Sequence, residues 1–258
     1  IDMAALKQGL QFKQAEVHGM SQRGGAVSSH LRLSDKTIHS DLVPRGSGTL
    51  VLAVEPLESL RYIDYLSPQG TVVTGTDPFI NIPDYADIDK VLDKVASLPS
   101  HTLIPADRLA RQAGTAKAQN MVLLGAASPY LDLPEALLEE GIREAFARKG
   151  EKVQDTNIAA FRAGRAAGQA YRACIGAGIS SRHARLLVGR LVDGKLSADA
   201  LDPWKHVFAG PVAEPIDALL SSKSPGKIVG DSEIPKTLAT MGESARDKLR
   251  ELLFKAGS

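Results

Sequence analysis

The side chains best suited to chemistry lie in one short segment near the start of the chain. Glycines and polar residues are interleaved there at close spacing: Glu16, His18, Gly19, Ser21, Gln22, Arg23, Gly24, Gly25 and His30. Glycines let a backbone come close to a ligand, and successive free N–H groups together with Arg23 suit a carboxylate or a phosphate. Glu16 and His18 can add hydrogen bonds or proton transfer. The segment predicts a loop that binds an anionic group.

A purely structural interpretation of the same segment stays open. In that interpretation the glycines form a turn, Arg23 pairs with Glu16, and His18 is a hydrogen-bonded residue of an interface. Residue types and spacing alone do not decide between the two.

Glu55 and Glu58 flank Pro56 where a helix is expected to begin. Acidic residues in a first turn stabilise the helix dipole by about 0.3–1 kcal/mol, which explains both without catalysis. Glu55 also follows an apolar run with strand character, and ligands of open α/β sheets bind at the carboxyl ends of strands. We therefore keep Glu55 as a candidate catalytic residue beside His18 and Arg23.

The motifs of common cofactor sites are incomplete in this sequence. The stretch from Gly189 to Lys195 has the glycine spacing of a phosphate-binding loop, but Leu196 stands where Ser or Thr would bind magnesium. The six histidines show no metal-ligand spacing, so we expect no metal site. The single cysteine, Cys174, can form no disulfide within the chain and cannot hold an iron-sulfur cluster, which needs about four thiolates. It is compatible with a reducing compartment, and we expect the cytoplasm.

Charge and hydropathy exclude two classes of partner. The 258 residues carry 31 Lys+Arg against 30 Asp+Glu, so no strong field favours nucleic acid or an anionic membrane. The longest apolar runs, such as residues 49–54, are far shorter than the ~20 residues that cross a bilayer. We expect no nucleic-acid binding and no membrane span.

Apolar strand-like runs alternate with segments of helical period, which is typical of an α/β fold. Strands are expected near residues 12–17, 27–33, 49–54, 71–75 and 101–104, and helices near residues 56–66, 87–97, 106–113, 120–128 and 154–174. The pattern predicts a three-layer α/β sandwich with a largely parallel sheet. Beyond Gly176 the chain changes to short helical pieces broken by prolines. We therefore predict one domain over residues 1–175 and a helical extension of unknown role over residues 176–258.

The sequence EVHGMSQRGG at residues 16–25 resembles the hallmark of the gamma-domain family of 2-oxoacid:ferredoxin oxidoreductases. The resemblance continues through HLR at 30–32, EPLESLRY at 55–62 and NMVLLGA at 120–126, and covers roughly residues 4–172. Members of that family usually begin with a strand and a loop of the form GxGGQG, which does not precede Ile1 here. We therefore expect that an N-terminal segment is missing from this sequence.

The resemblance implies a chain that is not a complete catalyst alone. It implies a larger partner subunit that carries thiamine diphosphate, magnesium and iron-sulfur clusters, and no cofactor held by this chain by itself. The complex would decarboxylate an arylpyruvate oxidatively, indolepyruvate in particular, to an acyl-CoA while reducing ferredoxin. The nearest approach to a thiamine diphosphate motif here, Gly230-Asp231-Ser232, has no asparagine after it, in agreement with this division.

Within such a complex, the loop from His18 to Gly25 would position substrate or coenzyme A at the subunit interface, with Arg23 and the glycine amides orienting an anionic group. The alternative is a non-catalytic assembly subunit whose loop binds only the partner chain. A third possibility, an independent α/β enzyme, requires activity from the single chain, and the absence of any complete cofactor motif speaks against it.

Overall fold

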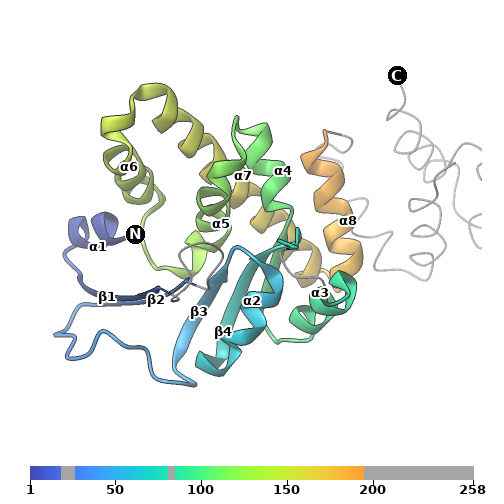
Figure 1. Ribbon diagram of the computed structural model, residues 1–258, viewed down its shortest axis with the longest axis horizontal. Coiled ribbons are helices and arrows are strands. Elements are labelled where there is room, and N and C mark those ends of the chain that lie inside the picture. Colours follow the sequence, from blue (N-terminus) through green and yellow to red (C-terminus); the bar gives the residue numbers. More distant parts are fainter. Residues whose placement is uncertain (19–26, 81–84, 195–258) are drawn as a thin grey trace, which may run out of the picture. The chain divides into compact units, whose positions relative to one another are not determined.

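The computed structural model describes residues 1–18, 27–80 and 85–194 and divides into two compact units, Ile1–Gln169 and Ala170–Ser258. Figure 1 shows the elements in order. They are α1 (Asp2–Lys7), β1 (Gln11–His18), β2 (Val27–Ser34), β3 (Gly48–Ala53), α2 (Pro56–Arg61), η1 (Ile63–Tyr65), β4 (Leu66–Gly75), α3 (Ile88–Ala96), β5 (His101–Ile104), α4 (Ala106–Gln112), η2 (Ala116–Ala118), α5 (Gln119–Ala127), η3 (Ser128–Tyr130), α6 (Glu135–Ala145), η4 (Ala147–Lys149), α7 (Glu151–Gly176) and α8 (Ser181–Val192).

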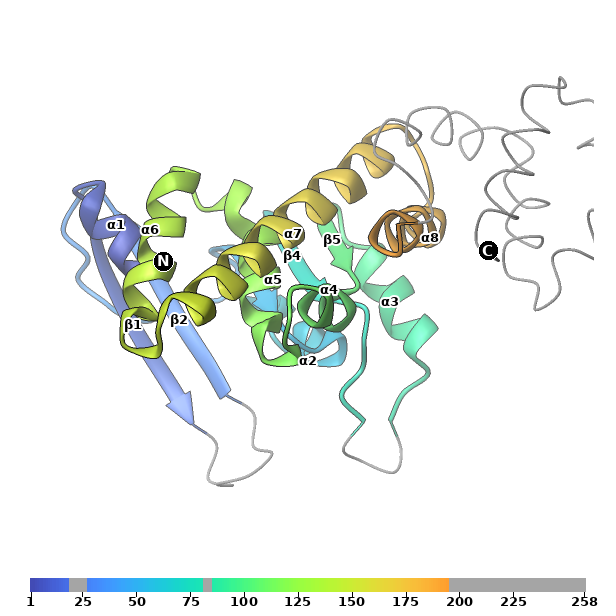
Figure 2. The same cartoon turned by 90° about the horizontal axis from the view of Figure 1, so that it is seen from above.

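A parallel sheet of order β3-β4-β5 forms the centre of the first unit. The six consecutive residues 70–75 of β4 are all buried, as a parallel strand covered on both faces requires. The connections through α2 and α3 lie on one face, and α5 packs on the other, against all three strands (Figures 1 and 2). The expected α/β architecture with helical layers around a parallel sheet is confirmed.

The helices α5 and α7 pack with their backbones in close approach, which glycine permits. A Cβ on Gly125 would lie 1.9 Å from the Phe161 carbonyl oxygen, and one on Gly164 would lie 1.8 Å from the Val122 carbonyl oxygen. Only a residue without a side chain fits at either position. Gly168, one turn further along α7, has its nearest neighbour atoms at 3.1 Å in Ala126. These glycines therefore fix how closely α7 approaches α5.

The first two strands do not join the parallel sheet. β1 and β2 form a separate antiparallel pair whose register runs from Gln11 opposite Ser34 to His18 opposite Val27. Strand character in the sequence placed both strands correctly, but it did not distinguish this hairpin from the parallel sheet. The reason is that strand pairing depends on which elements pack together in the folded chain, and local strand propensity does not contain that information.

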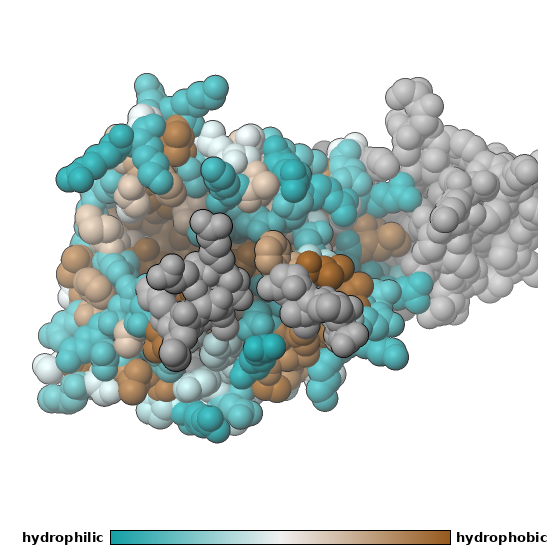
Figure 3. Space-filling view, viewed as in Figure 1, coloured by the Kyte–Doolittle hydropathy of each residue, from teal (hydrophilic) through white to brown (hydrophobic). Residues whose placement is uncertain are grey.

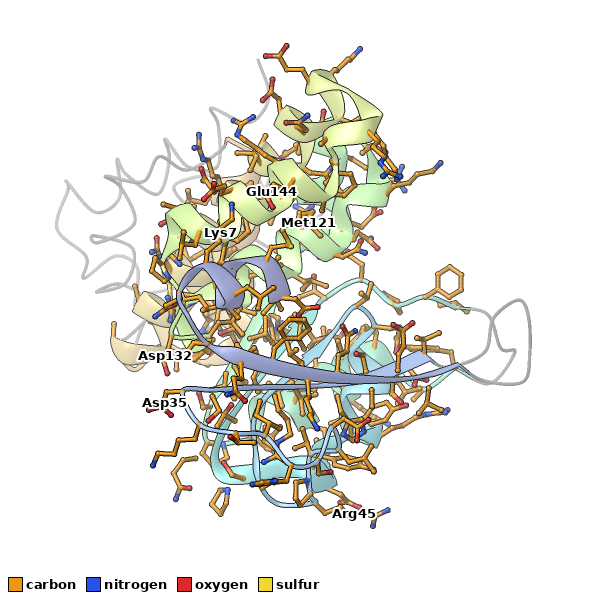
Figure 4. The ribbon with its side chains drawn as sticks, turned by 90° about the vertical axis from the view of Figure 1, so that its left-hand side faces the viewer. Lys7, Asp35, Arg45, Met121, Asp132 and Glu144 are labelled. Carbon is orange, nitrogen blue, oxygen red and sulfur yellow. The ribbon has the colours of Figure 1, made fainter. Side chains whose placement is uncertain are left out.

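A second core lies where α1 packs against α6 and the start of α7. Its buried residues are Ala4, Ala5, Leu124, Leu133, Leu138, Ile142, Ile158 and Phe161, and Met121 packs against them (Figure 4). At its edge Lys7 pairs with Glu140 at 2.6 Å and with Glu144, which Figure 4 labels. Helix α1 is thus tied to α6 by both apolar burial and charge.

The second unit is described from the end of α7 to residue 194. Helix α8 begins at a Ser180 cap, whose side chain accepts a hydrogen bond from the His183 N–H, and Tyr171 and Ser181 share a hydroxyl hydrogen bond of 2.7 Å. Burial raises the pKa of Tyr171 to about 12, and Cys174 beside it in α7 is buried. The domain boundary expected near residue 176 stays a prediction, and the rest of the extension, residues 195–258, lies outside the described residues.

Candidate functional site

Polar residues follow the strands at the carboxyl end of the parallel sheet. Glu55 comes two residues after β3, Asp77 two residues after β4, and Asp107 at the start of α4, which follows β5. The three positions are brought together by the parallel register, because adjacent parallel strands end at one edge. This edge is where ligands of open α/β sheets bind.

Glu55 makes two hydrogen bonds at this edge. One of its carboxylate oxygens accepts from the Glu58 N–H at 2.8 Å and so caps α2, as acidic residues at this position favour. The other accepts from the hydroxyl of Tyr85. Burial, and then the hydrogen bond and charge of Glu55, raise the pKa of the Tyr85 hydroxyl above its ordinary value. Glu55 therefore has two roles in the structure: it caps α2 and it accepts a hydrogen bond from Tyr85.

Tyr85 was not among the residues expected at a site. It stands 30 positions after Glu55, and no motif or spacing links the two in the sequence. Only the return of the chain from β4 toward α3 brings the phenol to the end of β3. A single sequence carries no signal that predicts this contact between Tyr85 and Glu55.

The two aspartates lie in a set of hydrogen bonds that is already satisfied. Asp77 accepts from the Asp107 N–H at 3.2 Å, and the Asp107 carboxylate accepts from Gln119 at 3.0 Å and from Arg111 at 2.7 Å. Burial raises the pKa of the Asp77 carboxyl, and the Asp107 N–H opposes this only in part. These contacts hold the start of α4 against the connection after β4.

The chemically dense segment begins at the end of β1 and continues in the sequence to β2. Glu16 is exposed on β1 opposite Ser29, and His18 is the last paired residue of that strand. The candidates Gly19, Ser21, Gln22, Arg23, Gly24 and Gly25 lie outside the described residues. Their predicted role in binding substrate or coenzyme A therefore stays a prediction.

His30 lies on β2, away from the tip. Its Nδ1 accepts a hydrogen bond from the Val43 N–H at 3.0 Å, and its ring meets that of Tyr65 edge-on with centroids 5.1 Å apart. Both contacts hold the connection between β2 and β3, which gives His30 a clear structural role. A part in substrate binding stays a prediction for this residue.

The end of β1, the start of β2 and the chain that leaves β4 lie on the same side of the first unit. Figures 2 and 4 show this in two perpendicular directions, with the ends of β1 and β2 and the chain leaving β4 on one side and α1 on the other.

A groove between α6 and α7 lies elsewhere and has no free charge to offer a ligand. It is lined by Glu135, Ala136, Glu139 and Arg162. Arg162 binds both oxygens of Glu139, at 2.5 and 2.6 Å, and thereby lowers the pKa of that carboxyl. Glu135 pairs with Arg165 at 2.8 Å. The groove is part of the ion pairing that holds the two helices together.

Neither a metal cluster nor a membrane span is found in the described ranges 1–18, 27–80 and 85–194. Among these residues no group of three or more His, Cys, Asp and Glu is placed to hold a metal ion. Among the same residues no helix is long and apolar enough to cross a membrane.

The family model of pyruvate ferredoxin/flavodoxin oxidoreductase matches residues 1–167. That stretch holds the parallel sheet, the hairpin and the helices around them, so this chain belongs to the pyruvate ferredoxin/flavodoxin oxidoreductase family.

Curated relatives match the same stretch. The chain is 31% identical over 173 residues to the indolepyruvate oxidoreductase subunit IorB of Archaeoglobus fulgidus, covering 64% of this chain and 84% of the relative. It is 34% identical over 172 residues to the protein of the same name in Thermococcus kodakarensis, covering 62% and 83%. The resemblance inferred from the residues is confirmed.

Among solved structures, the chain resembles a 2-oxoglutarate:ferredoxin oxidoreductase from Magnetococcus marinus with a TM-score of 0.50 and 21% identity. The match covers 65% of this chain but only 27% of that chain. Similarity at this level shows the fold. It also shows that in a protein of this fold the matched domain is about a quarter of a much longer polypeptide.

Proposed function

We propose that this chain is a subunit of a 2-oxoacid:ferredoxin oxidoreductase complex and that the complex acts on an arylpyruvate, indolepyruvate in particular. The observation that carries the proposal is the identity of 31–34% with indolepyruvate oxidoreductase subunits over more than four fifths of their length. The reaction converts the 2-oxo acid and coenzyme A to an acyl-CoA and carbon dioxide, and the two electrons released reduce two molecules of ferredoxin.

The chain works with a larger subunit that carries thiamine diphosphate, magnesium and iron-sulfur clusters, and it holds none of these by itself. Thiamine diphosphate supplies the chemistry that stabilises the carbanion formed on loss of carbon dioxide. We assign the complex to the cytoplasm, in keeping with the lone cysteine, Cys174.

This chain contributes positioning at the interface of the two subunits. In this proposal the loop from His18 to Gly25, which follows β1 in the sequence, reaches the interface with the larger subunit. Arg23 and the glycine amides would bind a carboxylate of the substrate or a phosphate of coenzyme A, and Glu16, Ser21 and Gln22 would complete the loop's hydrogen bonds. Supported by an exposed hairpin, such a loop can reach into a partner.

The alternative is an assembly subunit of the same kind of complex, whose loop contacts only protein. Its support is that the polar residues of the described carboxyl edge, Glu55, Asp77 and Asp107, already have partners within the chain.

The test is coenzyme A-dependent reduction of a low-potential dye by this chain reconstituted with its larger subunit, offered indolepyruvate and then pyruvate. We expect activity only when both chains are present, and a higher kcat/KM for indolepyruvate. Full activity of the larger chain alone would reduce this chain to assembly. A preference for pyruvate would overturn the aryl substrate and leave the subunit role intact.

A further inference from the structure

The connection between β2 and β3 contains a sequence that a protease can recognise. Residues 42–47 are LVPRGS, so Arg45 is preceded by Pro44 and followed by Gly46. Of the 14 prolines in the chain, only Pro44 stands directly before an arginine. A trypsin-like serine protease binds a basic side chain in its S1 pocket and cuts the chain after that residue. The sequence therefore offers one site to an endopeptidase that requires proline before arginine.

The backbone of this segment favours the extended conformation in which a protease cleft binds its substrate. Proline fixes its own φ at about −65° and biases the residue before it, here Val43, toward extended backbone. Dihedral angles that are already restricted lower the conformational entropy that binding costs. Gly46 has no side chain to obstruct the approach to the peptide bond between Arg45 and Gly46.

The residues around this peptide bond are accessible from solvent. Residues 44–47 are all exposed, and Leu42 is 53% exposed. The Arg45 side chain is 74% exposed and contacts two neighbours, the Asp64 carboxylate at 3.7 Å and the face of the Tyr65 ring at 5.9 Å. An ion pair at this exposure contributes little free energy, so the guanidinium can leave it for a protease pocket.

The connection also has the surface character of a cleavable segment. Figure 4 labels Arg45 at the periphery of the first unit. The outline that this connection forms at the lower left of Figure 1 is covered mainly by teal and white side chains in Figure 3. Exposed connections with small and polar residues are the preferred sites of proteolytic cleavage.

Hydrogen bonds before the arginine hold the segment against β2. Arg32 Nη1 donates to the Ser40 carbonyl at 3.1 Å and to the Leu42 carbonyl at 3.3 Å. The Val43 N–H donates to His30 Nδ1 at 3.0 Å. Both anchoring side chains, Arg32 and His30, come from β2 and lie on the same face of that strand, two residues apart.

A further hydrogen bond follows the arginine. The Gly46 N–H donates to the Asp64 carbonyl at 2.8 Å. A protease needs the segment extended in its own cleft, so the bonds on both sides must open before the chain is cut. The anchors therefore set the rate at which the folded chain is cleaved.

We propose that residues 42–47 are a site of limited endoproteolysis by a serine endopeptidase that requires proline before arginine, and that the first unit stays folded after the cut. Water adds across the Arg45–Gly46 peptide bond, which leaves a carboxylate on Arg45 and an amino group on Gly46. The site does not depend on the place of the chain in an oxidoreductase complex.

The two fragments, residues 1–45 and 46–258, share contacts that do not pass through the cut. Helix α1 of the first fragment buries Ala4 and Ala5 in the core that includes α6 of the second fragment. Lys7 of the first pairs with Glu140 and Glu144 of the second. Every strand pair of the described chain lies within one fragment, β1 with β2 and β4 with β3 and β5. The cut therefore removes a covalent connection and no part of the core.

The experiment incubates the full, folded chain with thrombin, a serine endopeptidase that cuts after arginine preceded by proline, and follows the intact mass with time. We expect a single cut between Arg45 and Gly46. The fragments should elute together in size-exclusion chromatography. Arg45→Gln should abolish the cut and keep the thermal midpoint, because the side chain that enters the S1 pocket is exposed here.

Variants of the anchors test the role of the hydrogen bonds. His30→Ala should raise the rate of cutting of the folded chain about 10-fold, because it removes one bond that closes the segment and the rate follows the population of the open form. Arg32→Ala, which frees the Ser40 and Leu42 carbonyls, should do the same. The matched control is His39→Ala, which changes the same residue type at an exposed position of the same connection and should leave the rate unchanged.

Each other outcome overturns a part of the proposal. If thrombin cuts the chain at Arg45 in urea but not in its folded state, the segment is not a site in the native protein. If the folded chain is cut first after another arginine or lysine, the assignment to residues 42–47 is wrong. If the fragments separate after the cut, the first unit does not stay folded without the connection. Equal rates for His30→Ala, Arg32→Ala and His39→Ala would show that the anchors do not control cleavage.

Discussion

The parallel sheet and the hairpin of the first unit differ in how they are stabilised. Six consecutive residues of β4 are buried between helical layers, whereas none of the described side chains of β1 and β2 is buried. The sheet is therefore held by packing on both faces, and the hairpin chiefly by its own register and by the connections at its base. The residues with the richest chemistry fall in the sequence at the end of β1 and between β1 and β2, and the tightest glycine contacts lie beside the sheet. The tightest packing and the loop predicted to bind an anionic group therefore fall in different regions, as is usual where a rigid scaffold carries functional loops.

The largest expected effect lies in the scaffold. Gly164→Ala would place a Cβ 1.8 Å from the Val122 carbonyl oxygen and force α7 away from α5. We expect the free energy of unfolding, measured by urea denaturation, to fall by about 3 kcal/mol. Gly176→Ala is the matched control, because it makes the same change in the same helix where nothing lies within 4 Å. Equal stability of the two variants would show that the close approach of α5 and α7 is not required.

The next prediction concerns the loop that follows β1 and tests the role of Arg23 in turnover. We expect turnover of the reconstituted complex to fall about 10-fold to 100-fold, the loss of about 2 kcal/mol from a charge-assisted hydrogen bond. The thermal midpoint and the affinity for the larger subunit should not change. Lys13→Ala, which removes an exposed basic residue of the same hairpin, is the control and should keep wild-type turnover.

If this chain is instead an assembly subunit, a different result is expected for Arg23→Ala and its control Lys13→Ala. Arg23→Ala would then weaken association, while the complex that does assemble would turn over at the wild-type rate. Wild-type behaviour in both respects would contradict both interpretations of the loop.

The smallest expected effects concern the end of β3, where Glu55 meets Tyr85. Glu55→Ala removes the cap of α2 and should cost about 1 kcal/mol of stability, and Tyr85→Phe should cost a similar amount. The double variant should cost less than the sum, because both changes remove the same hydrogen bond. Tyr62→Phe serves as the control for Tyr85→Phe. It also removes a tyrosine hydroxyl, but it keeps the contact between the rings of residues 62 and 65. Strict additivity would show that Glu55 and Tyr85 do not interact.

Much of the fold could be predicted from local patterns. The strands expected near residues 71–75 and 101–104 are found in β4 and β5, and the helix expected near residues 87–97 is found in α3. Here the apolar period, the turn residues and the Asp87 cap all agree, so local propensity and packing favour the same structure. For β1 and β2, the local pattern predicts where the strands lie in the sequence, but it does not predict which strands they pair with.

The candidate site likewise contains residues that could be predicted from the sequence and residues that could not. The sequence predicted Glu55 at a helix start that follows a strand, because Pro56 and Glu58 mark that start, and the structure makes Glu55 the cap of this helix. Tyr85 could not, because its contact depends on the path of the chain after β4. His30 was expected near a ligand because it lies in the polar segment near the start of the chain, and the structure gives it a hydrogen bond from the Val43 N–H.

The sequence by itself determined the family, the α/β class and the positions of the strands and helices, because these depend on local periodicity and on a long contiguous motif. The tertiary structure decided that the first two strands form a separate hairpin, that α5 and α7 meet through glycines, and that Glu55 meets Tyr85. The physical reason is that burial, backbone approach and side-chain partners depend on segments far apart in the chain, whose contacts exist only after folding.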